Sequence, residues 1–196
     1  PPPTLLVVPG RDWDRAGISQ LQRWQADGHP LAGNGWRHAI DGFGGIGHRV
    51  HSALISRRVA EHLSLDAEGI LALMRRCHAW FGQHDLTPDG LYVPPAWALG
   101  ALPLRRLDEQ PFSLVETLRG IHSRADGRWR YRALLGYEAG NRLQKAALQV
   151  SNAVNRRRAP AAGLRIGLHP HDAQLPLAGA MDRDLARFSP RPPAGG

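Results

Sequence analysis

The chain has 196 residues, with 25 Lys plus Arg, 17 Asp plus Glu and a single cysteine, Cys77. Its 42% hydrophobic content is enough to bury a core, which excludes wholesale disorder, and one cysteine excludes both an internal disulfide framework and a multi-cysteine zinc cluster. No apolar run approaches the roughly 18 residues of a membrane span. No signal peptide is visible, so we expect a cytoplasmic protein whose natural N-terminus lies upstream of Pro1.

The net charge of +8 comes almost entirely from arginine, because Lys145 is the only lysine. A nucleic-acid-binding domain gathers its cations on one face and interleaves them with aromatic residues. Here the arginines are scattered, apart from the run at 156–158, which we place near the end of a helix. We therefore expect no nucleic-acid partner. The alternative, a basic nucleic-acid-binding domain, predicts binding that depends strongly on salt.

Short apolar runs alternate with helical patterns along the chain. Residues 4–8 form an apolar run that ends at Pro9-Gly10, as a buried strand does. The further predicted elements, in chain order, are a helix at 19–26, a strand at 31–33, a glycine-rich loop at 41–51, a helix at 67–84, strands at 91–93, 111–116 and 131–135, a helix at 138–155, a strand at 164–168 and a helix at 181–188. This alternation is typical of an α/β fold with a mostly parallel sheet or barrel.

Two of the predicted helices carry clear signals. Asp66 is a good N-cap for the helix at 67–84. The apolar residues at helical spacing on that helix are Ile70, Leu73, Met74, Cys77, Trp80 and Phe81. In the helix at 138–155, one stripe carries Leu143, Ala147, Val150 and Val154. We expect residues 189–196, which are rich in proline and glycine, to form a disordered tail.

Three predicted strands end in segments of unusual composition. They are Asn34-Gly35-Trp36-Arg37-His38, Tyr92-Val93-Pro94-Pro95-Ala96-Trp97 and Leu168-His169-Pro170-His171-Asp172. In barrels and doubly wound folds the functional residues lie at the carboxyl ends of strands. Imidazole side chains in two of these segments can bind a metal or transfer a proton near neutral pH.

In this order, the three segments resemble the polysaccharide deacetylase superfamily, and in particular a poorly characterised branch with a His-Gly-aromatic-x-His motif. The resemblance covers roughly residues 4–185. Residues 28–33 lead into the segment that corresponds to this motif, here Asn34 to His38. Residues 91–97 are similar to the family's proline–aromatic motif, and residues 168–172 to its closing histidine motif.

The resemblance implies a fold and a reaction. The fold is a distorted (β/α) barrel of the deacetylase type that spans residues 1–188 and lacks its first strand. The reaction is the hydrolytic removal of an acetyl group from an N- or O-acetylated carbohydrate. A divalent metal, usually zinc, is held in the family by one Asp and two His, activates water and polarises the acetyl carbonyl. An Asp of the opening motif is the base, and a closing His protonates the leaving group.

Carried over residue by residue, the resemblance makes His169 the general acid and places His38 and Asn34 at metal-ligand positions. It also implies a substrate-binding role for several residues of the other segments. These are Tyr92, Pro95, Trp97 and Asp172.

Three departures bear on activity. The opening Asp motif is absent from this chain, Asn34 replaces a His, and Val93 replaces an Arg found in many members. An amide oxygen is a poor zinc ligand, so we expect weak or absent zinc binding and impaired hydrolysis. Substitute ligands would be His48, His51 or Glu116.

Each motif also has a simpler explanation. In that explanation His38 and His169 are loop histidines without a ligand, Asn34 is a turn residue, and Trp97 is a core aromatic. The alternative function is a catalytically silent, deacetylase-like domain that binds carbohydrate or a protein. The sequence leaves open the sugar, the acyl group and the oligomeric state.

Overall fold

The computed structural model describes residues 2–37, 61–139 and 141–188. The chain divides into two compact units, Pro2–Arg130 and Tyr131–Gly196, which are described separately. Within the described ranges, no helix combines the length and the apolar character needed to cross a bilayer.

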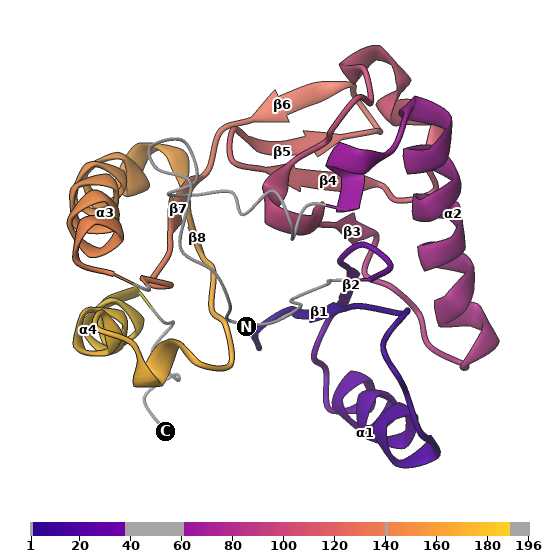
Figure 1. Cartoon of the computed structure of the whole chain (residues 1–196), viewed down its shortest axis with the longest axis horizontal. Coiled ribbons are helices and arrows are strands. Elements are labelled where there is room, and N and C mark those ends of the chain that lie inside the picture. The colour runs from indigo at the N-terminus through magenta and orange to yellow at the C-terminus, as the bar shows by residue number, and fades with distance from the viewer. Residues whose placement is uncertain (1, 38–60, 140, 189–196) are drawn as a thin grey trace, which may run out of the picture. The chain divides into compact units, whose positions relative to one another are not determined.

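A six-stranded sheet forms the centre of the first unit (Figure 1). Its first four strands run parallel and neighbour one another in chain order: β1 (Leu5–Val7), β2 (Leu31–Gly33), β3 (Leu91–Tyr92) and β4 (Leu114–Thr117). The order and direction of these strands confirm the predicted α/β fold with a mostly parallel sheet. Because the four strands are parallel, their carboxyl ends lie at one edge of the sheet.

Two antiparallel strands that the sequence analysis missed extend this sheet. They are β5 (Gly120–Ser123) and β6 (Arg128–Arg130). Asp126 and Gly127 stand between them, and Gly127 adopts a positive φ of 64°. The connection is four residues long, and glycine at its last position adopts the left-handed region without a Cβ clash, which is a typical signal of a hairpin loop.

The helices of this unit begin at side-chain caps. In α1 (Arg15–Ala26) the Asp14 carboxylate accepts the backbone N–H of Gly17, which starts the helix four residues earlier than predicted. In α2 (Ala67–Gln83) Asp66 does the same for Gly69, as predicted. A short 3-10 helix, η1 (Glu61–Ser64), precedes α2.

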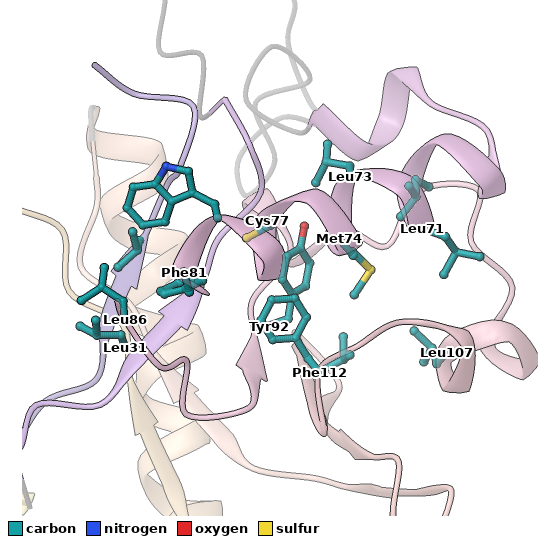
Figure 2. Close-up of a cluster of buried hydrophobic side chains, with 14 of the residues drawn as sticks. Leu31, Leu71, Leu73, Met74, Cys77, Phe81, Leu86, Tyr92, Leu107 and Phe112 are labelled. Carbon is teal, nitrogen blue, oxygen red and sulfur yellow. The ribbon is translucent and has the colours of Figure 1, made fainter. Parts of the chain in front are cut away.

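The predicted apolar face of α2 is buried against the sheet, and Figure 2 shows this core. A Cβ atom at Gly33 would lie 2.9 Å from the Cys77 Sγ, 2.9 Å from the Phe112 ring and 3.0 Å from the Tyr92 ring. Only glycine at this position allows α2 to pack so closely on β2. Burial raises the pKa of Cys77 to about 12, so the thiol stays protonated.

The second unit contains a parallel pair, β7 (Ala133–Leu135) and β8 (Leu164–Ile166), with α3 (Arg142–Ala162) and α4 (Ala178–Phe188). Its core is a small apolar cluster made of Leu135, Tyr137, Ala139, Leu177 and Met181. The helix α3 runs seven residues past its predicted end, with Pro160 in its last turn.

The apolar stripe of α3 faces outward rather than toward the sheet. The buried side carries Asn152, whose amide group bonds both the N–H and the carbonyl of Gly136, and Asn155, which donates to the carbonyl of Leu134. These are the backbone groups on the side of β7 that does not face β8. The Asn side chains of α3 therefore pair with backbone groups on the open side of β7, and the aliphatic residues of the predicted stripe remain at the surface.

A buried histidine contacts Tyr92, the last residue of β3. His62 has no exposed surface, and its Nε2 lies 2.7 Å from the Tyr92 hydroxyl oxygen. The two rings are also stacked, with centroids 5.7 Å apart. Burial lowers the pKa of His62 from 6.5 to about 4, so the folded protein keeps this ring neutral at neutral pH.

The free energy of unfolding should therefore fall as the pH drops from about 6.5 toward about 4. In this range the unfolded chain protonates His62 and the folded chain does not, which favours unfolding by about 2 kcal/mol at roughly pH 5. His62→Gln keeps a hydrogen-bonding group beside Tyr92 without titrating, so its stability should depend less on pH. Urea denaturation across this pH range measures both slopes. Equal slopes for the two proteins would contradict this assignment.

Candidate functional site

Loops at the carboxyl ends of the parallel strands contact one another in a continuous row. After β1, the N–H of Gly10 donates to the carbonyl of Trp36 at 2.7 Å. After β2, Gly35 lies against Pro95, where an added Cβ would stand 2.5 Å from the proline ring. The indole N–H of Trp97, after β3, donates to Glu116 of β4 at 3.0 Å. The row joins two of the predicted motifs at one edge.

The loop after β2 begins at Asn34 and is held by a carboxylate from η1. The N–H of Asn34 donates to the carbonyl of Val7, which continues the strand pairing. One oxygen of Glu61 then accepts the backbone N–H groups of both Trp36 and Arg37, each at 2.9 Å. Glu61 therefore fixes the path of the chain directly after Asn34. This role of Glu61 was not predicted, because a single Glu before a helix belongs to no recognisable motif.

Trp36 is a second residue of the edge that the sequence analysis did not single out. The Arg76 guanidinium carbon lies 3.7 Å from the centre of the Trp36 ring, a cation–π contact made from the exposed side of α2. Trp36 is half-buried and also packs against the main core cluster. Its position between Asn34 and His38, inside the predicted motif, was the sequence signal that could have identified Trp36 as a residue of this edge.

The proline–aromatic loop after β3 has a strained backbone. Ala96 (φ 54°) and Trp97 (φ 56°) both adopt the left-handed region, which disfavours any residue with a side chain. The Trp97 N–H donates to the carbonyl of Pro94, and its indole is fixed by Glu116. Strain of this kind persists only where surrounding contacts impose it, and it gathers at functional sites.

The residues predicted to bind substrate differ in their exposure. Trp97 is half-buried at the edge, whereas Pro95 is buried against the loop after β2. Tyr92 is fully buried and bonded to His62, so it supports the edge from below rather than presenting a surface. Asp172, in the second unit, is only 1% exposed.

In the second unit, His169 follows β8 and lies between two carboxylates. Its Nε2 is 3.7 Å from Glu138, and its Nδ1 is 3.8 Å from the Asp172 Oδ2. The same Asp172 oxygen accepts the backbone N–H of His169 at 2.9 Å, so Asp172 holds the turn that carries the imidazole. A protonated His169 would form an ion pair on each side, while its side chain stays 42% exposed.

The described residues do not form a zinc site. Within residues 2–37, 61–139 and 141–188, no three His, Cys, Asp or Glu side chains gather as metal ligands would. Asn34 supplies only a neutral amide, and an oxygen of Glu61 is already occupied by two backbone donors. His38, His48 and His51 lie outside the described residues.

In comparisons with known proteins, no family model, no curated protein and no solved structure matches the chain.

Replacing Ala96 by glycine should relieve the strained loop. We expect Ala96→Gly to leave the free energy of unfolding unchanged or to raise it by up to about 1 kcal/mol, because glycine adopts a positive φ without a Cβ clash. The matched control is Ala72→Gly at an exposed position of α2, where the same exchange should cost about 1 kcal/mol. Chemical denaturation measures both. Equal destabilisation by both exchanges would show that residue 96 is not strained.

Proposed function

We propose that this chain is a domain of the polysaccharide deacetylase type that binds acetylated carbohydrate at the carboxyl edge of its parallel sheet, and whose hydrolytic activity is impaired by Asn34. The proposed architecture is the distorted (β/α) barrel of that superfamily. The observation that carries the proposal is the row of contacts from Gly10 through Trp36 and Pro95 to Trp97 and Glu116.

Two properties of this edge suit a sugar. The half-buried indole of Trp97 offers flat apolar surface, which matches the apolar face of a pyranose ring, while Trp36 is half-buried with the Arg76 guanidinium over its ring. Both residues are held in place. Glu61 accepts the backbone N–H of Trp36, and Glu116 accepts the indole N–H of Trp97. Fixed aromatic groups bind with little loss of conformational entropy.

Proton transfer is the chemistry that the second unit can offer. The imidazole of His169 is partly exposed, and Asp172 accepts the backbone N–H of the turn that carries it, so within the second unit His169 is a group that can transfer protons. In this proposal Asp172 is a positioning residue, because its carboxylate holds the turn and is itself buried.

The edge as described does not complete a hydrolytic site. Zinc sites in hydrolases normally use three protein ligands drawn from His, carboxylate or thiolate. The described residues around Asn34 do not supply such a set. The proposal of impaired hydrolysis with retained sugar binding rests on Asn34, whose neutral amide stands at a metal-ligand position of the family's motif.

Binding can be tested with an N-acetylglucosamine tetrasaccharide in calorimetric titrations. We expect Trp97→Ala to weaken binding about tenfold, equivalent to about 1.4 kcal/mol, because it removes the indole from the edge. Trp24→Ala is the matched control, since Trp24 is 41% exposed on α1. Loss of binding in both variants, or in neither, would refute the placement of the sugar at this edge.

Acetate release distinguishes an impaired enzyme from the silent carbohydrate-binding alternative. With the same tetrasaccharide and added zinc, and in a chain extended at its N-terminus by an Asp-bearing strand of the family, we expect Asn34→His to release acetate at least tenfold faster than the extended chain that keeps Asn34, because imidazole is a preferred zinc ligand. Asn34→Gln, which keeps the neutral amide, is the control. Unchanged release by Asn34→His with unchanged sugar binding would favour the silent domain.

A further inference from the structure

The outward face of α3 has the composition of a docking surface. Leu143, Val150 and Val154 have exposed fractions of 77%, 66% and 39%, and Ala147 is exposed between them. Their spacing of four, three and four residues places them on one side of the helix. We call this set the outer stripe. The opposite side of α3 is the one that packs on β7 through Asn152.

The charged residues of α3 itself are all positive. The sequence of α3 contains five cations and no Asp or Glu; the cations are Arg142, Lys145, Arg156, Arg157 and Arg158. Arg156 is paired with the buried Asp184 of α4 through two hydrogen bonds. Arg142, Arg157 and Arg158 are exposed and form no ion pair with any residue that the structure describes. Cations therefore stand at both ends of the stripe.

A hollow lies beside the C-terminal end of the helix. It has a volume of about 390 Å³ and is lined by Tyr131, Arg158, Ala161 and Ala162. Ala161 follows Val154 by seven residues, so it continues the line of the outer stripe. The surface thus combines an aliphatic row with flanking cations, and the open hollow adds apolar wall atoms at the C-terminal end of the helix.

We propose that the outer stripe of α3 binds an acidic amphipathic helix of a partner protein. Aliphatic side chains of that helix would lie along the stripe, and its carboxylates would pair with Arg142 at one end and with Arg157 and Arg158 at the other. Helix-on-helix docking of this kind uses apolar residues at spacings of three and four. The stripe from Leu143 to Val154 is about 17 Å long, so it fits a partner helix of about three turns.

Two other occupants, a second copy of the chain and a membrane, suit this surface less well. A second copy packed antiparallel on this face would bring Arg142 of one chain beside Arg158 of the other, and a parallel packing would align every cation with its equivalent, so like charges would repel. A membrane-binding helix normally places Trp, Phe or Leu in its apolar face. This stripe holds one leucine, with alanine and valine, and small aliphatic residues suit close helix packing.

Fluorescence anisotropy with two labelled peptides tests the proposal on the intact chain. Both are designed three-turn helices with the same aliphatic row; one carries flanking glutamates and the other flanking lysines. We expect the acidic peptide to bind at least tenfold more tightly than the basic one, and its affinity to fall with added salt. Leu143→Glu combined with Val150→Glu should weaken binding of the acidic peptide at least tenfold.

A control variant in the first unit and a thermal unfolding measurement accompany the binding experiment. Leu104→Glu changes a leucine of similar kind, 50% exposed in the first unit, and should leave binding unchanged. Thermal unfolding confirms that the stripe variant is folded, as expected for substitutions at exposed positions. The proposal is overturned if both peptides bind equally, if neither binds, or if the Leu104 variant is affected as strongly. It is also overturned if the stripe variant abolishes a dimer seen by sedimentation or binding to phosphatidylserine vesicles.

Discussion

The packing of α2 on β2 depends on the absence of a side chain at Gly33. Cys77, Tyr92 and Phe112 all approach the space that a Cβ atom would fill, and Asn34 follows directly in the chain. Any larger residue would push α2 away from the sheet or displace Tyr92, and Tyr92 is hydrogen-bonded to His62 of η1. Close packing of this core thereby sets the position of the loop that carries the candidate motif.

From that core, the candidate site is built by contacts between consecutive loops. Parallel pairing brings the strand ends to one edge, and Glu61, a neighbour of the buried His62 in η1, fixes the backbone after Asn34. Trp97 is held in a strained conformation by Glu116 of the next strand. The arrangement orders aromatic surface in advance of binding, and this property supports our proposal of a carbohydrate site.

Apolar runs and helical periodicity in the sequence were sufficient to predict the positions of β1 to β4 and α2, since strong local patterns determine those elements. They failed where tertiary contacts override pattern. The stripe of α3 is exposed because Asn152 and Asn155 satisfy the open side of β7, a partner that periodicity does not reveal. Glu61 was missed because its function lies in two backbone contacts made 24 and 25 residues away.

Indole N–H signals in nuclear magnetic resonance spectra test most directly whether the carboxyl edge is the carbohydrate site. Single Trp→Phe variants assign the signals, and the N-acetylglucosamine tetrasaccharide is then titrated into the unaltered chain. The account predicts that the signals of Trp36 and Trp97 shift together with one dissociation constant, while those of Trp24 and Trp80 stay unchanged. Shifts confined to Trp24 or Trp129, or no shifts at saturating sugar, would contradict it.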